Sequence, residues 1–341
     1  MNDQIQKVLD GNRRALARML TLVENEREGY EDALAALFPH TGKAWIIGIT
    51  GAPGTGKSSL VNALTHAYRR LEKTVGILAV DPTSPFTGGA ILGDRIRMRD
   101  LYSDPGVFIR SMATRGSLGG LSKATRNAIR VMDAGGFDII IVETVGAGQS
   151  EVDIVRTAQT TIVVEAPGLG DDVQAIKAGI LEIADILVVN KADRVGAKNA
   201  AQALKMMLET GHPASRTQTV IHHGEAMRVE STPPPDNPLW IPPIILTVTM
   251  DSTGIDELVQ AIQNHQLYLE QNQLSAELER QRIEIELFER LREALITRLM
   301  NGLSTDDIAA VIKRVQARQL EPSQAVNTLI DKGYFDENSR D

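Results

Sequence analysis

The sequence predicts an α/β fold in which a mostly parallel central sheet is covered by helices, and three observations support this prediction. Short apolar runs of strand length end in polar or glycine-rich turns: WIIGIT, VGILAVD, FDIIIVET, TTIVVEA, DILVVNK and PIILTVT. Amphipathic segments of helix length lie between these six runs, and such alternation is typical of a parallel sheet with helices on both faces. Hydrophobic residues make up 43% and charged residues 23% of the 341 positions, which is the composition of a globular chain.

The chain begins with a helical segment, residues 1–40, in which Gly11 interrupts the first piece. Apolar residues recur there three, four or seven positions apart: Leu9, Leu16, Leu20 and Val23. The strands begin at Trp45, and we assign residues 41–265 to the sheet domain. The helices expected between its strands are Ser58–Leu71, Ser122–Ala134, Val173–Ile183 and Ala197–Glu209.

The alternation of strands and helices stops at residues 211–243. This stretch is rich in Pro, Gly, Ser and Thr and shows no sustained period, so we expect a long loop before the last strand. After Thr249, the segment DSTGIDELVQAIQNH predicts a turn and a closing helix, with Asp251 or Ser252 as its N-cap. We expect the sheet domain to end near His265.

Residues 266–341 are expected to be helical to the end of the chain. Apolar residues nearly follow a heptad spacing in this part: Leu274, Leu278, Ile285, Phe288, Leu295 and Leu299. Gln281 and Arg292 interrupt that seam. The pattern fits a helix that packs on its own domain and an arm that joins two copies of the chain equally well. We take 266–341 as a C-terminal helical dimerisation arm.

Composition and charge exclude several classes of protein. The chain has no cysteine, which excludes a disulfide scaffold, a thiolate metal site and a cysteine nucleophile. The 44 acidic and 36 basic residues give a formal charge of −8, which disfavours nucleic-acid and anionic-membrane partners. The first residues lack the apolar core of a signal peptide, and no apolar run approaches the ~20 residues of a spanning helix. We therefore expect a cytoplasmic protein with neither a nucleic-acid nor a membrane partner.

The strongest motif, GAPGTGKS at residues 51–58, lies between the strand WIIGIT and a helix and matches a phosphate-binding loop in spacing and context. Its glycines let backbone N–H groups point at phosphate oxygens, and the following helix adds its positive end. Lys57 supplies a charge to the outer phosphates, and Ser58 supplies a hydroxyl ligand to Mg²⁺. The motif thus predicts a P-loop NTPase. The residues expected to contact nucleotide here are Gly51, Ala52, Pro53, Gly54, Thr55, Gly56, Lys57, Ser58 and Ser59.

A second motif, NKAD at residues 190–193, directly follows the strand DILVVN. Guanine carries two adjacent donors, its N1–H and its exocyclic amine, and the single carboxylate of Asp193 can accept from both. Adenine lacks this pair, so it would leave the carboxylate unpaired and would be rejected. Asn190 and Lys191 complete the expected guanine-binding set, and the predicted nucleotide is GTP or GDP.

A third segment, ETVGAGQSE, follows the strand FDIIIV. Glu143 stands at the carboxyl end of that strand, from which an acidic side chain reaches the metal, usually through water, while Gly146 permits a backbone N–H to approach the γ-phosphate. Because Ala147 follows Gly146, no glutamine stands there to orient the attacking water, and we expect a slow GTPase that a partner accelerates. The candidates for a further contribution to hydrolysis are Gln149, Lys177 and Arg95.

These motifs, together with DPTSP at 81–85 and GGAILGDR at 88–95, make the chain resemble the MeaB/ArgK family of GTPases, which are related to the human methylmalonic aciduria type A protein. The resemblance covers essentially the whole chain. It implies a homodimer that binds GTP and Mg²⁺, hydrolyses GTP slowly alone, and acts on an adenosylcobalamin-dependent acyl-CoA mutase. In that role it would gate cofactor loading and help protect or reactivate methylmalonyl-CoA mutase or a related mutase.

The resemblance also implies roles for individual residues. Lys177 lies in the segment GLGDDVQAIK, which resembles a mobile loop through which the mutase influences hydrolysis. The residues similar to the family's magnesium site are Ser58, Asp81, Asp94 and Glu143. The expected catalytic residues are Lys57, Asp94, Glu143 and Lys177.

Two other functions compete with this one. One is a nickel-type metallochaperone GTPase, from the broader group of G proteins to which the resemblance assigns the MeaB/ArgK family. It would need a His-rich or Cys-containing metal tract, which the sequence lacks. A small-molecule kinase, such as one related to arginine and ornithine transport, would have little use for Asp193.

A cluster of basic residues is more simply a solvated helix face, with a partner-docking or CoA-facing surface as the alternative. Its members are Arg95, Arg97 and Arg99 and, further along the chain, Arg110, Arg115, Lys123, Arg126 and Arg130.

Overall fold

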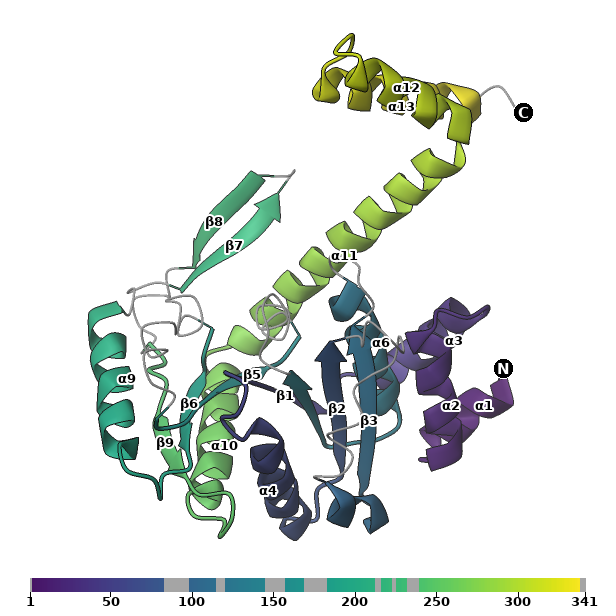
Figure 1. Ribbon diagram of the computed structural model, residues 1–341. Coiled ribbons are helices and arrows are strands. Elements are labelled where there is room, and N and C mark those ends of the chain that lie inside the picture. Colours follow the sequence, from purple (N-terminus) through teal and green to yellow (C-terminus); the bar gives the residue numbers. More distant parts are fainter. Residues whose placement is uncertain are drawn as a thin grey trace. The chain divides into compact units, whose positions relative to one another are not determined.

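The structure is a computed structural model, in which the protein forms two compact units, Met1–Gln273 and Leu274–Asp341 (Figure 1). The residues that it describes are 2–82, 98–114, 120–144, 157–168, 183–211, 216–222, 225–231 and 239–337. The first unit is built on a seven-stranded sheet with helices on both faces, so the predicted α/β fold is confirmed. The three-part division predicted from the sequence stays a prediction.

The strands of this sheet run parallel to one another in the order β3-β2-β4-β1-β5-β6-β9. Their bounds are β1 Trp45–Thr50, β2 Val75–Pro82, β3 Val107–Thr114, β4 Ile139–Thr144, β5 Thr160–Glu165, β6 Ile186–Asn190 and β9 Ile244–Thr247. Because parallel strands end at one edge, the carboxyl ends of β1, β4, β6 and β9 lie together there. Open parallel sheets bind their ligands outside this carboxyl edge.

Two helical layers cover the sheet, and the strand residues alternate between them. Ile141 of β4 packs with α4 and α10 on one face, whereas Ile140 and Val142 pack with α2, α3 and α6 on the other. Both faces are thus apolar, which is why the strands read as continuous apolar runs. The helices of this unit are α1 Asn2–Leu9, α2 Arg13–Glu24, α3 Tyr30–Leu37, η1 Phe38–His40, α4 Lys57–Arg70, η2 Arg99–Ser103, α6 Gly120–Ala134, α9 Ala197–Gly211 and α10 Ile255–Gln271.

Three of the four helices expected between strands are confirmed with ends within two residues of the prediction, as α4, α6 and α9. The fourth, Val173–Ile183, lies outside the described residues except for Ile183. The expected cap of the closing helix is wrong, because α10 has Gly254 at its N-cap with φ 76 and no side-chain cap. Asp251 Oδ1 instead accepts from the N–H of Thr253 at 3.0 Å, within the turn before the helix.

All six predicted strands are present, but the main sheet has a seventh, because β3 is an additional edge strand beside β2. Its sequence, VFIRSMAT, has Arg110 and Ser111 in the middle and therefore lacks an unbroken apolar run. The Arg110 side chain is half-buried and pairs with Glu24 of α2, and its Nη2 also donates to Thr21 Oγ1 at 3.1 Å. The strand tolerates an arginine because α2 supplies the partners.

The basic cluster of the sequence contributes further contacts to the N-terminal helices. Lys123 Nζ lies 3.1 Å from a carboxylate oxygen of Glu26, and the Arg130 guanidinium lies over the Phe38 ring at 5.7 Å from its centroid. Arg95, Arg97 and Arg115 lie outside the described residues, and the side chain of Arg99 is not described. The side chains of Arg110, Lys123 and Arg130 are structural supports, so neither the solvated-face interpretation nor the docking interpretation describes them fully.

The prediction of a long loop at residues 211–243 is wrong for much of that stretch. β7 (Arg216–His222) and β8 (Glu225–Ser231) form an antiparallel hairpin separate from the main sheet, in which His222 is opposite Glu225. An isolated two-stranded hairpin need not bury one complete face in a core, so its sequence carries little of the period-two signal that marks strands.

Both tryptophans of the chain lie at the amino ends of the strands, opposite the loops that carry the sequence motifs. Trp45 Nε1 donates to Thr160 Oγ1 at 3.0 Å, and that hydroxyl lies 3.0 Å from His265 Nδ1. Trp240 Nε1 donates to the carbonyl of Asp185 at 2.8 Å, and its ring centroid lies 4.9 Å from that of His265. The network joins the starts of β1, β5 and β6 to α10.

The second unit consists of α11 (Leu274–Asn301), α12 (Thr305–Gln316) and α13 (Pro322–Glu337). Ser304 and Asp307 form a capping box at the start of α12. α11 and α13 approach closely at Gly333, where an added Cβ would lie 2.3 Å from Leu299 Cδ1. Across the described part of the chain, every helix is too short or too polar to cross a membrane.

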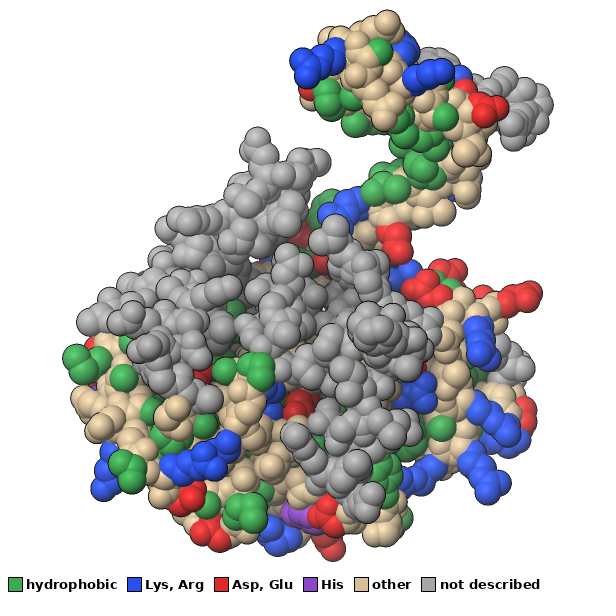
Figure 2. All heavy atoms as spheres, viewed as in Figure 1, with side chains coloured by type: hydrophobic (Ala, Val, Ile, Leu, Met, Phe, Trp, Pro, Cys, Tyr) green, Lys and Arg blue, Asp and Glu red, His purple; other side chains and the backbone are tan. Residues whose placement is uncertain are grey.

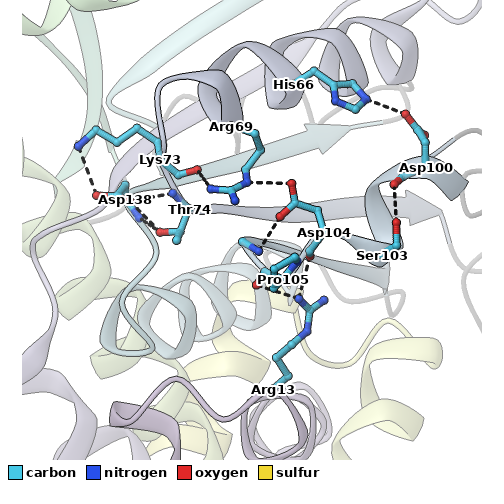
Figure 3. Close-up of polar contacts among 11 residues, drawn as sticks. Arg13, His66, Arg69, Lys73, Thr74, Asp100, Ser103, Asp104, Pro105 and Asp138 are labelled. Carbon is cyan, nitrogen blue, oxygen red and sulfur yellow. Dashed lines mark hydrogen bonds and ion pairs between the residues drawn. The ribbon is translucent and has the colours of Figure 1, made fainter.

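A turn after η2 joins α4 to the N-terminal helices (Figure 3). Asp104 Oδ2 accepts from Arg69 Nε of α4 at 3.0 Å, and Asp104 Oδ1 accepts from the N–H of Gly106 at 2.7 Å. Arg13 of α2 donates to the carbonyls of Asp104 and Pro105, each at 3.0 Å. The hydrogen bond from Arg69 outweighs the partial desolvation of the carboxyl, and the pKa of Asp104 is lowered.

The Asp104 contacts predict part of the acid sensitivity of the fold. A lowered pKa stabilises the folded state fully above the unfolded-state pKa of about 4, and this contribution is lost as pH falls through the folded-state value. We expect Asp104→Asn to be less stable than the wild type at pH 6 and to lose less of its free energy of unfolding between pH 6 and pH 3. Urea unfolding at both pH values measures this. The control is Asp256→Asn, which removes the exposed ion pair between Asp256 and Arg70, the residue next to Arg69 in α4. An equal loss of free energy of unfolding in Asp104→Asn and in the wild type would contradict the assignment.

Candidate nucleotide-binding site

The loop between β1 and α4 has the backbone of a phosphate cradle. Gly51, Gly54 and Gly56 have φ values of 139, 84 and 93, which only glycine adopts without strain. Gly51 also packs against β5 so closely that an added Cβ would lie 2.1 Å from the Val164 carbonyl oxygen. α4 begins at Lys57 without a side-chain cap, so the N–H groups of its first turn face the loop without a competing acceptor from the capping residue. This arrangement suits an anion.

Lys57 is buried at the centre of this loop, with 6% of its surface exposed. Its Nζ donates to the carbonyl of Gly51 at 2.7 Å and to that of Ala52 at 3.0 Å. The ammonium therefore bridges the two carbonyls at the start of the loop. A cation held in this position is close to the expected phosphates and in an environment of low dielectric, where its charge acts strongly.

Ser58 and Glu143 meet beside the loop. Ser58 Oγ donates to Glu143 Oε1 at 2.6 Å, and both residues are buried. Strand register explains the meeting, because β1 and β4 are neighbours and Ile49 pairs with Glu143. The next residues of these strands also contact each other, since Thr144 Oγ1 donates to Thr50 Oγ1 at 3.1 Å. A hydroxyl and a carboxylate at this point are the hard oxygen ligands that Mg²⁺ prefers.

Several expected site residues cannot be placed against this pair. The backbone of Asp81 lies in β2, which adjoins β4 with Ala79 opposite Glu143, but the Asp81 side chain is not described. Three more lie outside the described residues: Asp94, Gly146 and Lys177. Their roles stay predictions.

The NKAD motif reaches the same loop from β6. Asn190 is buried, and its Nδ2 donates to the carbonyl of Thr55 at 2.9 Å. Lys191 has φ 57, and its Nζ donates to the carbonyl of Gly54 at 2.6 Å. Asp193 follows on an exposed turn, where its carboxylate is accessible to a ligand. The structure thus brings two of the three predicted guanine-site residues into direct contact with the phosphate loop.

One residue at this site lies outside the sequence motifs. Thr247, the last residue of β9, is fully buried, and its Oγ1 donates to Asn190 Oδ1 at 3.2 Å. A signal for it exists, because the polar Thr247 interrupts the apolar run PIILTVT near the carboxyl edge of the sheet.

Comparisons with known proteins show the family to which the whole chain belongs. Residues 16–304 match the family model described as methylmalonyl Co-A mutase-associated GTPase MeaB. A Pyrococcus horikoshii protein that carries a GTPase name is 46% identical over 332 residues, which cover 97% of this chain and 98% of that one. GTPase ArgK of Escherichia coli is 36% identical over 264 residues, covering 76% of this chain and 74% of that protein.

A further relative is the mitochondrial methylmalonic aciduria type A homolog of Caenorhabditis elegans, 37% identical over 208 residues, which cover 55% of this chain and 51% of that protein. Among solved structures, a LAO/AO transport system kinase is similar, with a TM-score of 0.67, 26% identity, and coverage of 97% of this chain and 96% of that one. The α/β fold of the first unit agrees with the structural match. The chain belongs to the MeaB family of methylmalonyl-CoA mutase-associated GTPases.

Proposed function

We propose that this protein binds GTP with Mg²⁺ and hydrolyses it to GDP and phosphate. The observation that carries the proposal is the convergence of Lys57, Asn190 and Lys191 on the loop from Gly51 to Gly56, each through a hydrogen bond from its side chain to a loop carbonyl. A loop that holds phosphates is thereby joined to a motif whose carboxylate, Asp193, suits guanine. A nucleotide that fills both parts at once is a guanosine phosphate.

The oxygens of Ser58 and Glu143 fit Mg²⁺, and Asp81 and Asp94 are proposed to complete the metal site. Bound Mg²⁺ would neutralise charge on the phosphate oxygens. Lys57 holds its ammonium near the same oxygens and stabilises the negative charge that they carry during transfer to water. Hydrolysis depends on such positioning and electrostatics, and Lys177 is proposed to add a charge to the site when a partner is bound.

We further propose that the partner is an adenosylcobalamin-dependent acyl-CoA mutase. The family's description names methylmalonyl-CoA mutase, which supports a role in gating cofactor loading and in protecting or reactivating that mutase or a related one. A nickel chaperone is less consistent with a chain that has no cysteine. A small-molecule kinase would not need the guanine-binding carboxylate of Asp193.

Nucleotide binding and turnover of the purified full chain test this proposal. We expect GDP and GTP to bind far more tightly than ADP and ATP, and basal hydrolysis to depend on Mg²⁺ and to stay below about 1 s⁻¹, the low end of kinase rates. Addition of an adenosylcobalamin-dependent acyl-CoA mutase from the same cell should raise the rate. Equal affinity for ATP and GTP would favour a kinase. A pull-down with the GTP-loaded protein that recovers no cobalamin enzyme would contradict the proposed partner.

A second copy of the chain is the other proposed partner. An apolar stripe along α11, made of Ile283, Leu287, Phe288, Leu291 and Leu295, is exposed, with 45–62% of each residue accessible. Figure 2 shows apolar side chains along this helix. Their spacing of mostly four residues puts them on one side of the helix. The stripe differs from the predicted heptad seam, of which it keeps only Phe288 and Leu295. An apolar stripe of this kind marks an interaction site, and we propose that it joins two copies of α11.

A charge in the stripe is therefore expected to separate the copies. Burying one leucine contributes about 1.5–3 kcal/mol, and a symmetric dimer buries two, so Leu287→Glu should weaken dimerisation by a factor on the order of 10² or more. Light scattering across a dilution series measures this. Glu293→Lys, a charge reversal at an exposed position on the opposite side of the same helix, should remain dimeric. A wild type that is monomeric throughout, or a Leu287→Glu variant as dimeric as the wild type, would contradict the assignment.

A further inference from the structure

Three buried groups form a hydrogen-bonded chain from the last strand of the sheet to the phosphate loop. Thr247 Oγ1 donates to Asn190 Oδ1 at 3.2 Å, and Asn190 Nδ2 donates to the carbonyl of Thr55 at 2.9 Å. None of the three residues has more than 1% of its surface exposed. In such an environment a lost hydrogen bond is not replaced by one to bulk water, so each link matters.

The chemistry of the chain fixes the orientation of the Asn190 amide. The carbonyl of Thr55 can only accept, so the amide must present its NH₂ group there and its oxygen to Thr247. The Thr247 hydroxyl then has to donate to Asn190 Oδ1. If this donor were absent, the amide oxygen would lie buried without its partner, and rotation of the amide would set two oxygens against each other at Thr55.

The hydroxyl of Thr247 is not needed to hold the strands together. β6 and β9 are parallel neighbours with Asn190 directly opposite Thr247, and the ladder between their backbones extends over Leu187–Asn190 and Ile244–Thr247. The side-chain hydrogen bond is additional to that ladder, and it is directed at Asn190, whose amide donates to the phosphate loop.

We propose that Thr247 is a positioning residue for guanine nucleotide binding, and that it acts by holding the Asn190 amide against the phosphate loop. The inference rests on the proposed guanine site. Asn190 belongs to the motif that receives the base, and its amide contacts the loop that receives the phosphates, so its orientation couples the two halves of the site. Without the Thr247 hydroxyl, the base motif and the phosphate loop are joined less firmly, and bound nucleotide leaves faster.

The test compares Thr247→Val, Thr247→Ser and a matched control. Thr65→Val also removes a fully buried hydroxyl, but that hydroxyl donates to the Val61 carbonyl within α4 at 2.7 Å and does not contact the site. The dissociation constant and the dissociation rate of a fluorescent GDP analogue are measured for each protein, together with its melting temperature in the absence of nucleotide.

We expect Thr247→Val to raise the dissociation constant about tenfold, equivalent to ~1.4 kcal/mol, mostly through faster dissociation. Thr247→Ser should restore binding to within about twofold, because it keeps the donor. Thr65→Val should lower the melting temperature without changing the affinity. If Thr247→Val does not fold, Thr247→Ala replaces it, since it removes the donor without placing a methyl group against Asn190.

The outcomes separate the inference from the proposed function. Wild-type protein that fails to bind the GDP analogue would overturn the proposed function and the inference together. Wild-type binding combined with unchanged affinity in both Thr247→Val and Thr247→Ala would overturn the inference alone. So would an equal loss of affinity in Thr65→Val, or a Thr247→Ser variant as weak as Thr247→Val, because either result would trace the effect to general destabilisation.

Discussion

Replacing Lys57 with alanine is expected to lower the turnover of GTP by a factor on the order of 10²–10³, the usual effect of removing one preorganised group that stabilises developing charge. The ammonium of Lys57 is buried and is held by the carbonyls of Gly51 and Ala52 at the start of the phosphate loop. Its attachment to the first turn of α4 sets its place before nucleotide arrives, so little reorganisation is needed during the reaction. Alanine leaves the loop carbonyls without this donor and the phosphates without this charge.

Hydrolysis under saturating GTP and Mg²⁺ measures the effect, and nucleotide affinity is determined alongside it. Lys73→Ala is the matched control, because Lys73 lies just beyond the other end of α4 with 53% of its side chain exposed and forms one surface ion pair with Asp138. Such a pair contributes at most about 1 kcal/mol to stability, so turnover by Lys73→Ala should equal that of the wild type. A Lys57→Ala variant with wild-type turnover would remove Lys57 from the mechanism.

The second large effect concerns the base. Asp193→Asn should raise the dissociation constant for GDP by a factor on the order of 10²–10⁴, because each hydrogen bond to a charged group contributes ~1.5–3 kcal/mol and the carboxylate accepts two from guanine. The same change should improve binding of xanthosine diphosphate. Xanthine has a carbonyl where guanine has its exocyclic amine, and the asparagine amide can donate to that oxygen and accept from the ring N–H.

Competition between the two diphosphates for a fluorescent nucleotide analogue measures this exchange of specificity. Asp256→Asn removes an exposed carboxylate of α10 and should bind both nucleotides as the wild type does. If Asp193→Asn still preferred guanine by the wild-type margin, the base would have to be recognised elsewhere. A loss of both nucleotides without any gain for xanthine would mean that Asp193 supports the loop rather than reads the base.

The sequence predicts the central part of the fold and site because their determinants are local. The spacing of Gly51, Gly56 and Lys57 records backbone angles and a charge that phosphate binding needs, and NKAD directly follows a buried strand. In the structure these local signals lie at one edge of the sheet. Their meeting follows from the parallel arrangement, which the alternation of strands and helices already indicates.

Other features depend on partners far away in the chain. β3 tolerates Arg110 only because Glu24 of α2 is close to it, and no local pattern around Arg110 contains that information. Thr247 matters through a hydrogen bond to a residue 57 positions earlier. The exposed stripe on α11 shares only Phe288 and Leu295 with the predicted heptad seam, because the sequence pattern cannot tell which apolar side chains of a helix stay accessible. Sequence motifs find residues that contact a ligand more readily than residues that hold those residues in place.

The position of the two tryptophans makes the intrinsic tryptophan fluorescence of the protein specific for its first unit. Trp45 and Trp240 share one cluster at the amino ends of the strands, and the second unit has no tryptophan. Emission excited selectively at the indole band therefore reports on the first unit alone, whereas far-ultraviolet circular dichroism also records the helices α11–α13. Divergence of the two signals during denaturation would separate the melting of the sheet from that of the C-terminal helices without any added probe.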